Sequence, residues 1–401
     1  MNHIKMTSSS CCGCTACAII CSKKAISFKS DKEGFYVPVV DEKSCIDCGL
    51  CIDACPALRT DKGSYIYGTK AYAFQYKDDN VRSNSASGAL FPAVAYHFIH
   101  NLNGYVCGCI LDDNLIVRHI VSNKWEDVER MQDSKYVQSN MDLCISKVIK
   151  LLKEDQYVLF SGTSCQVSGL LSVLEKKHIG REKLLSIDFF CHGVPSPMIW
   201  KDYVEHYSKL SGKSIEGYRF RNKTYGWGKG TRSRGTGFLS LWKYSGAFHE
   251  DWRLLARIWP RIFFSNICIR QYCHHCPYTC IEKPSDITMG DFWGIEEFRP
   301  SFSDGKGCSL AVIHNSKAEK ILLELRDTSI IEVSIQEVTK RQLNAFTASA
   351  PHPLREEFWT CYSKEGFKGV LSKYLNYTEM GRLRALVKYL LFKLNLRNYS
   401  Y

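Results

Sequence analysis

Two four-cysteine runs near the N-terminus have a spacing that could bind metal clusters. Both fit C-x2-C-x2-C-x3-C, first at Cys11, Cys14, Cys17, Cys21 and again at Cys45, Cys48, Cys51, Cys55. Three thiolates spaced three positions apart can hold three corners of one [4Fe–4S] cube, while the fourth cysteine reaches the other cube. The predicted ligand sets are therefore Cys11, Cys14, Cys17 with Cys55, and Cys45, Cys48, Cys51 with Cys21.

The residues around these cysteines favour clusters over zinc. Gly13 and Gly49 let the backbone pass close to a cluster, and Ala16 and Ala54 are small and apolar, which keeps water off the sulfurs. Zinc knuckles use pairs of cysteines separated by longer loops, so two complete four-cysteine runs fit zinc badly. We predict a two-cluster domain of the bacterial ferredoxin type over residues 1–62.

A second group of cysteines leaves three chemistries open. The motif C-H-H-C at residues 273–276 lies between Cys268 and Cys280. A C-x-x-C pair can bind zinc, bind a cluster or act as a dithiol, and the spacing alone favours none of these. We expect the two histidines to face away, because the turn between the cysteines is tight. Cys12 is predicted to be a spare, packed thiol.

Composition and charge limit the class of protein. The chain has 401 residues, 20 of them cysteine, and we find no secretory signal and no apolar run that could span a bilayer. This combination predicts a cytoplasmic location and metal ligation rather than disulfides. The formal net charge of +12 treats every cysteine as a neutral thiol, whereas cluster ligands are negatively charged thiolates. We therefore do not interpret this charge as a sign of nucleic-acid binding. With no helix-turn-helix, RNP or zinc-finger pattern, we expect no nucleic-acid partner.

Hydrophobic periodicity predicts a mixed α/β body. Strands are expected over residues 70–75, 104–111, 115–121, 157–160, 184–190, 237–243, 286–290 and 310–314. Helices are expected over 125–132, 141–154, 165–176 and from 197 to about 210. Chemistry in such sheets collects at the carboxyl ends of strands, which selects residues 161–166 (SGTSCQ). This turn could hold a phosphate through backbone N–H groups, and a plain strand-to-helix turn explains it equally well.

Six segments in a fixed order resemble the coenzyme F420 hydrogenase/dehydrogenase beta-subunit family, fused to the ferredoxin-type module. They are residues 82–91 (RSNSASGALF), 134–139 (SKYVQS), 160–166 (FSGTSCQ), 191–197 (CHGVPSP), 220–227 (FRNKTYGW) and 285–294 (SDITMGDFWG). The resemblance covers residues 1 to about 320. It implies a larger α/β domain over 65–345 that binds FAD and iron–sulfur.

The resemblance also implies site residues. The implied ligands of a third [4Fe–4S] cluster are Cys165, Cys191, Cys273 and Cys276. Cys268 and Cys280 fall outside the family pattern, and either could replace one of the four. The implied flavin contacts are Ser87, Gly88, Ser134, Lys135, Tyr136, Gly162, Thr163, Asp291 and Trp293. In these roles, small residues admit the pyrophosphate, Lys135 neutralises it and Trp293 stacks on a ring.

These cofactors imply an iron–sulfur flavoprotein oxidoreductase. Electrons would pass between a ferredoxin-like carrier or partner redox subunit, the clusters and FAD, and a small organic substrate or deazaflavin-type cofactor would be reduced or oxidised. His192 is predicted to supply a proton near the flavin, and the alternative is a hydrogen-bonded structural histidine. Two other classes stay open: an electron-transfer subunit without its own substrate, and a metal-stabilised protein without turnover.

The C-terminal residues 346–401 are predicted to form a basic helical tail. After a Pro-His-Pro linker at 351–353, helices are expected over 355–376 and 380–396. The second helix is basic and amphipathic, so it could lie on an anionic membrane surface. Packing against the body or a partner is the plainer interpretation.

Overall fold

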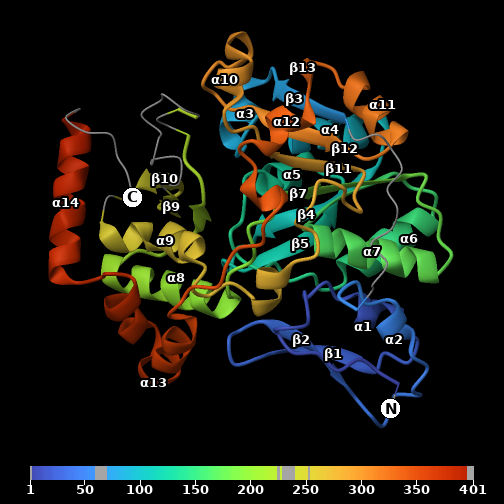
Figure 1. The fold of residues 1–401 in the computed structure, drawn as a ribbon, viewed down its shortest axis with the longest axis horizontal. Helices are drawn as coiled ribbons and strands as arrows, with labels where there is room; N and C mark the ends of the chain where they lie inside the picture. Colours follow the sequence, from blue (N-terminus) through green and yellow to red (C-terminus); the bar gives the residue numbers. More distant parts are fainter. Residues whose placement is uncertain (1, 59–69, 224–225, 228–239, 252, 395–401) are drawn as a thin grey trace.

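An eight-stranded mixed sheet forms the centre of the molecule (Figure 1). The computed structural model describes residues 2–58, 70–223, 226–227, 240–251 and 253–394. The strand order is β13-β3-β12-β11-β7-β6-β4-β5, in which β11, β7, β6 and β4 are parallel and the other pairs antiparallel. The strands are β3 (Lys70–Tyr76), β4 (Tyr105–Leu111), β5 (Val117–Ser122), β6 (Val158–Ser161), β7 (Leu184–Phe189), β11 (Ile287–Asp291), β12 (Ser309–Ile313) and β13 (Thr328–Val333).

The parallel strands are largely apolar because helices cover both faces of the sheet, and Asp188 of β7 and Asp291 of β11 are exceptions. In β6, Leu159 packs into one buried layer, whereas Val158 and Phe160 pack into the opposite one. The Leu159 layer contains α4 (Leu90–Tyr96), α5 (Trp125–Met131) and α11 (Ser316–Glu324). The other layer contains α6 (Cys144–Lys153) and α7 (Ser164–Lys176).

The N-terminal part, blue in Figure 1, lies against α6 and α7. It consists of α1 (Ala16–Ile20), β1 (Ile26–Ser30), β2 (Tyr36–Val40) and α2 (Leu50–Asp53). Strands β1 and β2 form an antiparallel hairpin. Gly169 on α7 permits the close approach, because a β-carbon there would lie 2.9 Å from Cys14 Sγ.

Arg270 ties this N-terminal part to the body. Its side chain is fully buried. It donates through Nε to the Cys11 carbonyl at 2.5 Å, through Nη1 to Gln138 Oε1 at 2.9 Å and through Nη2 to the Tyr36 carbonyl at 3.0 Å. Because a buried guanidinium is costly without acceptors, these bonds favour one position of the two-cluster part on the body.

A second lobe, on the left in Figure 1, has an aromatic core. Its sheet has the order β10-β9-β8 and consists of β8 (Gly217–Arg219), β9 (Leu241–Tyr244) and β10 (Ala247–Glu250). Its helices are α8 (Pro197–Ser211), α9 (Ile258–Ser265) and α13 (Arg355–Tyr374). Trp242 and Trp259 are completely buried there, and Trp242 stacks on Tyr207 with ring centroids 3.7 Å apart.

Local sequence signals set the ends of α8. The Ser196 hydroxyl accepts the N–H groups of Met198 and Ile199 at 3.2 and 3.4 Å, and Pro197 occupies the first helical turn. Gly212, with a φ of 66°, ends the helix in the left-handed conformation that glycine adopts easily. The segment Cys191–Pro197 therefore leads from β7 into a defined helix start.

Shorter elements connect these layers. They are α3 (Asp79–Asn84), η1 (His97–Asn101), η2 (Leu254–Arg257), η3 (Gln271–His275), α10 (Ile295–Phe298), η4 (Pro300–Phe302), α12 (Ile335–Thr339) and η5 (Leu343–Ala345). The last helix, α14 (Glu379–Lys393), follows α13. The mixed α/β class is confirmed. Of the strand expected over 237–243, residues 237–239 lie outside the described residues, and β9 begins at Leu241. The domain limits near residues 62 and 345 stay predictions.

Candidate metal centres and cofactor cavity

The predicted set Cys21, Cys45, Cys48 and Cys51 lines one small cavity of about 20 Å³. Cys21 follows α1, Cys45 and Cys48 stand in the loop before α2, and Cys51 lies in the first turn of α2. Gly49 opens this helix with a φ of 78°, a conformation that favours glycine. Cys48 is exposed, so this site reaches the solvent.

The other predicted set is buried. Cys11, Cys14, Cys17 and Cys55 are all almost fully removed from solvent. Burial raises the pKa of Cys17, and the neighbouring thiols of Cys11 and Cys55 raise it further. Burial also raises the pKa of Cys55. Thiols that lose their protons so reluctantly need a bound cation to become thiolates, so this donor set fits an iron–sulfur cluster.

Four cysteines from distant parts of the chain meet at a third cavity, of about 30 Å³. They are the four implied by the family resemblance: Cys165 in the first turn of α7, Cys191 after β7, Cys273 in η3, and Cys276 directly after η3. Burial raises the pKa of Cys191 to about 12 and that of Cys276 to about 11. Ser164 Oγ in the same lining is buried without a hydrogen-bond partner, and a cluster sulfur would provide an acceptor.

Cys268 and Cys280 do not line this third cavity. Cys268 is buried in the aromatic core of the second lobe, and Cys280 Sγ donates to a backbone carbonyl at 2.8 Å. Cys12 does line the cavity, and its thiol lies within hydrogen-bonding reach of Cys14 and Cys165. The cysteine that the sequence predicts to be spare therefore lies between two predicted ligand sets.

The two histidines of the C-H-H-C motif do not line the third cavity. His275 is exposed, and His274 Nδ1 lies 2.7 Å from the Ser349 carbonyl. This is the orientation expected from the tight turn between Cys273 and Cys276.

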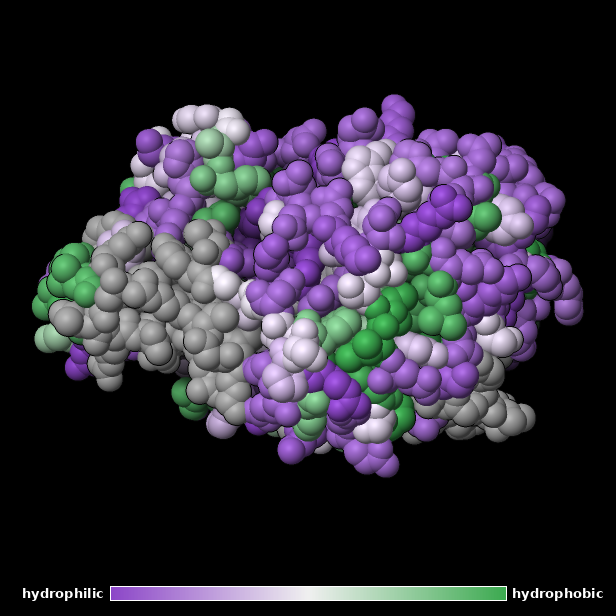
Figure 2. Space-filling model, turned by 90° about the horizontal axis from the view of Figure 1, so that it is seen from above, coloured by the Kyte–Doolittle hydropathy of each residue, from purple (hydrophilic) through white to green (hydrophobic). Residues whose placement is uncertain are grey.

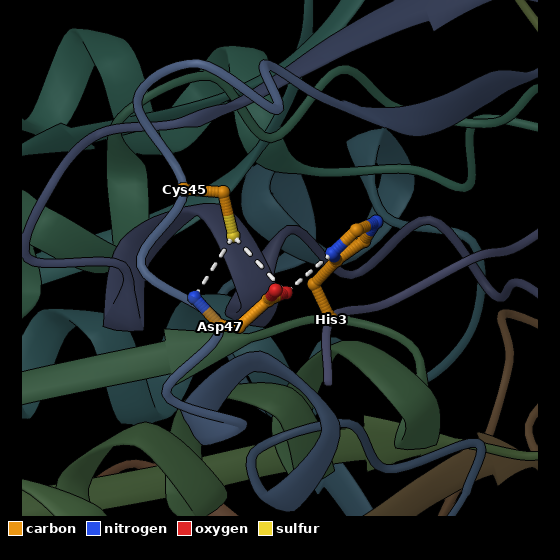
Figure 3. Close-up of side chains that lie close together, drawn as sticks. All are labelled: His3, Cys45 and Asp47. Atoms are coloured by element: carbon orange, nitrogen blue, oxygen red, sulfur yellow. Dashed lines mark hydrogen bonds and ion pairs between the residues drawn. The ribbon is translucent and has the colours of Figure 1, made fainter. Parts of the chain in front are cut away.

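His3 and Asp47 support the solvent-facing set, and no sequence motif identified them. Figure 3 shows both side chains beside Cys45. His3 Nδ1 lies 2.9 Å from Asp47 Oδ1, and this hydrogen bond lowers the pKa of Asp47. The Asp47 N–H donates to Cys45 Sγ at 3.5 Å. Cys45 already belongs to a four-cysteine set, so we interpret the His3–Asp47 pair as orienting the loop that carries Cys45. No spacing pattern links residue 3 to residue 47.

A much larger cavity, of about 430 Å³, opens at the carboxyl ends of β6, β7 and β11. This volume is in the range of small-molecule sites. Of the nine predicted flavin contacts, these line it: Ser87, Ser134, Lys135, Tyr136, Gly162, Thr163, Asp291 and Trp293. Gly88 does not. A β-carbon at Gly88 would lie 2.3 Å from the Phe74 carbonyl oxygen, so close backbone packing against β3 requires this glycine.

Two buried polar atoms in the lining have no hydrogen-bond partner. Asp291 Oδ2 pairs with Arg221 Nη1 at 2.6 Å, whereas Asp291 Oδ1 is unpaired. His119 Nε2 lies 3.0 Å from the Ser161 carbonyl, and its Nδ1 is unpaired. Burial lowers the pKa of His119 to about 4, so the ring is neutral and Nδ1 is an acceptor. Buried acceptors of this kind fit a ligand that carries hydroxyl or ring N–H groups.

Lys135 and Trp293 have partners within the protein. The Lys135 ammonium donates to the carbonyls of three nearby residues at 2.5–3.2 Å, and burial lowers its pKa to about 8. Lys135 therefore holds its own loop in this structure. The Trp293 ring stacks on Trp227, with centroids 5.0 Å apart and an interplanar angle of 10°.

His192 lines the large cavity and has partners at both ring nitrogens. Its Nε2 lies 2.7 Å from Asn266 Oδ1, so Nε2 carries a proton. Its Nδ1 lies 3.3 Å from Ser349 Oγ and 3.4 Å from Asn344 Nδ2. Burial lowers the pKa of the ring. Its catalytic role stays a prediction.

The third cavity and the large cavity share a wall. Thr163, Cys191 and Gly193 line both. Gly193 has a φ of 123°, and a β-carbon there would lie 2.8 Å from Ile269 Cγ2, so only glycine fits this position. On the other side of the third cavity, Cys12 contacts the buried N-terminal set. Cys51 of the solvent-facing set lies close enough to the buried set to raise the pKa of Cys17 and Cys55. The three cysteine sets and the large cavity therefore follow one another through the molecule.

Lys283 is a buried cation behind the wall that carries Cys191. It is almost fully buried, its Nζ donates to the Phe189 carbonyl at 3.1 Å, and it lies 4.7 Å above the Phe190 ring. Its charge lowers the pKa of Cys191 and of Cys276, against the larger effect of burial. Lys283 is thus close enough to stabilise negative charge at the third cysteine set.

Replacing Lys283 with methionine is expected to lower the reduction potential of the predicted third cluster by tens of millivolts. A unit charge about 10 Å away is worth roughly 70 mV at an effective dielectric constant of about 20. An EPR redox titration measures this shift, with the two N-terminal clusters as internal references. Lys283→Arg should restore the potential. An unchanged potential in Lys283→Met would refute the electrostatic role.

Two stretches of the chain match known families. Residues 155–338 match the C terminus of the beta subunit of coenzyme F420 hydrogenase/dehydrogenase, and residues 10–58 match the 4Fe-4S dicluster domain. The fold, the cysteine sets and these matches define an iron–sulfur electron-transfer protein. The chain therefore contains a region related to the C terminus of the beta subunit of coenzyme F420 hydrogenase/dehydrogenase and, in its N-terminal part, a 4Fe-4S dicluster domain.

One similar solved structure is a chain of the F420-reducing [NiFe] hydrogenase complex from Methanosarcina barkeri, studied by xenon derivatization. The TM-score is 0.43 and the sequence identity 13%, and the likeness covers 80% of this chain and 97% of that chain. No curated protein matches the sequence. None of the described helices has both the length and the apolar character needed to cross a membrane.

Proposed function

We propose that the protein is an FAD-dependent iron–sulfur oxidoreductase that reduces or oxidises a small organic substrate or a deazaflavin-type cofactor. The observation that carries this proposal is the shared wall between the third cysteine set and the large cavity, where Cys191 lines both. FAD, when bound, can exchange single electrons with clusters and a hydride with an organic substrate, which would connect the clusters to two-electron chemistry.

The residues of the chain have definable roles around that cofactor. Asp291 Oδ1 and His119 Nδ1 would accept hydrogen bonds from the ligand, since both are buried without a partner. Tyr136 stacks on Phe263, with centroids 4.3 Å apart, and this aromatic pair would exclude water from one side of the cavity. Gly162 and Thr163, at the start of α7, would bring backbone close to the ligand.

His192 is proposed to hold or supply a proton at Nε2 beside the flavin. That proton is already ordered by Asn266, whose own Nδ2 donates to the Ala350 carbonyl at 2.9 Å. Electrons are proposed to enter or leave at the solvent-facing set, where Cys48 is exposed. The partner there would be a ferredoxin-like carrier or a partner redox subunit.

The first test is the iron, acid-labile sulfide and flavin content of anaerobically prepared protein. We expect about twelve irons and one FAD per chain. About eight irons without flavin would contradict the proposal and leave an electron-transfer subunit without its own substrate.

A cavity-filling variant tests where the flavin binds. Ala86 lines the large cavity, so Ala86→Trp is expected to remove most of the flavin while the iron content stays at the parent value. The matched control is Ala247→Trp, since Ala247 is exposed on β10 and does not line the cavity. Flavin absorbance and iron are measured on the same samples. Parent-level flavin in Ala86→Trp would contradict the assignment of this cavity.

A further inference from the structure

The described side chains of helix α14 pack against the molecule through one face of the helix. Gly381 and Ala385 are buried, Tyr389 is half-buried, and the helix contacts η2 of the second lobe. Figure 1 shows α14 along the outer edge of that lobe, far from the N-terminal part. The opposite face of the helix is open to solvent.

That open face carries a continuous apolar stripe. Its members are Met380, Leu383, Val387, Leu390 and Leu394, with exposed fractions between 48% and 66%. Steps of three and four residues keep all five within an arc of about 80° on an α-helix. The described residues contain 19 exposed large apolar side chains; four of them lie on this helix, and a fifth, Leu394, directly follows it. Figure 2 shows apolar surface at the left edge of the molecule, the side on which α14 lies.

The charges beside the stripe are positive. Arg382, Arg384 and Lys388 are exposed. The single acidic residue of the helix, Glu379, lies 3.7 Å from Arg382, so Arg384 and Lys388 have no further carboxylate beside them on the helix. In the helical projection, these two flank the stripe on one side. An apolar stripe with a cationic border is complementary to a surface that is anionic outside and apolar beneath.

We propose that α14 docks this protein on the surface of an anionic lipid bilayer. The stripe enters the boundary between headgroups and acyl chains, and Arg384 and Lys388 meet the lipid phosphates. Because α14 lies far from the N-terminal part, the exposed Cys48 site stays open to a redox partner in the docked protein. This docking surface is independent of the proposed flavin chemistry.

Flotation of the full, cofactor-loaded chain with vesicles tests the proposal. We expect co-flotation with vesicles of phosphatidylcholine and phosphatidylglycerol, weaker binding at high salt, and little binding to phosphatidylcholine alone. Leu383→Glu with Leu390→Glu should weaken partitioning at least about tenfold, because the variant loses two apolar side chains and would have to bring two carboxylates out of water. The matched control is Leu210→Glu with Leu323→Glu, which adds the same charges at exposed leucines on α8 and α11.

A second variant keeps the test decisive if the stripe variant folds poorly. Arg384→Gln with Lys388→Gln leaves the apolar surface intact and should weaken binding to the anionic vesicles. The proposal is overturned if the parent chain does not float, or if the parent and both α14 variants partition equally. It is also overturned if the parent ignores vesicles but is a dimer in solution that the stripe variant makes monomeric, since a second copy would then cover α14.

Discussion

Cys165→Ser is expected to remove the third cluster and leave the other two in place. The iron content should fall from about twelve to about eight per chain. Cys165 lies in the first turn of α7 at the third cavity, and its neighbours there are the other three predicted ligands and Cys12. Because the third cavity separates the N-terminal sets from the large cavity, reduction of a bound flavin by way of the N-terminal clusters should stop.

Iron and sulfide analysis, with EPR of the reduced protein, measures this loss. Cys280→Ser and Cys268→Ser are the matched controls, because neither side chain lines the third cavity, and both should keep the parent iron content. If Cys280→Ser loses iron and Cys165→Ser does not, the ligand set is wrong. Cys12→Ser discriminates further: full iron content in that variant would show that Cys12 lies beside the cluster without binding it.

The N-terminal sets could be predicted from the sequence because their geometry is local. Each four-cysteine run spans eleven residues, so spacing alone brings most of a set together. The third set has no such signal, since its members come from α7, the loop after β7, and η3. Only the family resemblance connected them. The fold then explains the connection, because β6 and β7 are parallel neighbours and end at the same edge of the sheet.

Residues around the large cavity show where motif-based prediction stops. Gly88 belongs to a family segment, but the space it leaves is filled by the backbone of β3 and β12, so its role is packing. His119 is in no recognised segment, yet it lines the cavity with an unpaired acceptor. It lies on β5, which pairs antiparallel with β4 at the sheet edge. A burial pattern along one strand cannot show which cavity a polar side chain faces.

Hydrophobic periodicity also could not predict the edges of the fold. The pattern in β13 (TSIIEV) is half-exposed, and this strand completes the sheet through antiparallel pairing with β3, more than 250 residues earlier. The two C-terminal helices form close to where they were expected. Their different environments could not be predicted, because Phe358, Phe367 and Val370 of α13 are buried in the core of the second lobe, whereas α14 keeps an open apolar face.

A buried ion pair joins three distant segments of the chain. Glu33 lies in the turn of the β1–β2 hairpin, and Arg355 begins α13; both side chains are almost fully buried. Arg355 Nη1 donates to Glu33 Oε1 at 3.0 Å, and Nη2 donates to the other carboxylate oxygen and, at 3.2 Å, to the Ile269 carbonyl. The hairpin turn is fixed from a second side by Ser196, whose hydroxyl donates to the Glu33 carbonyl at 2.5 Å.

Arg355→Met is expected to destabilise the protein by about 3–5 kcal/mol, because it leaves the Glu33 carboxylate buried without its partner. Anaerobic urea unfolding, followed by tryptophan fluorescence and by iron release, measures this change. The matched control is Arg130→Met. Arg130 pairs with Asp113 at 3.0 Å, but their side chains are 41% and 97% exposed, so its loss should cost about 1 kcal/mol or less.

The double variant Glu33→Gln with Arg355→Met separates the two contributions to that cost. If the large effect comes from an unpaired buried charge, removing the charge should recover much of the stability. If it comes instead from lost packing of the hairpin turn on α8 and α13, the double variant should be as unstable as Arg355→Met. Recovery would mean that neutral side chains can replace the ion pair without a large loss of stability. The pair would then mainly select the docked position of the two-cluster part. A loss below about 1 kcal/mol in Arg355→Met would mean that Arg270 and Ser196 hold the two-cluster part without the ion pair.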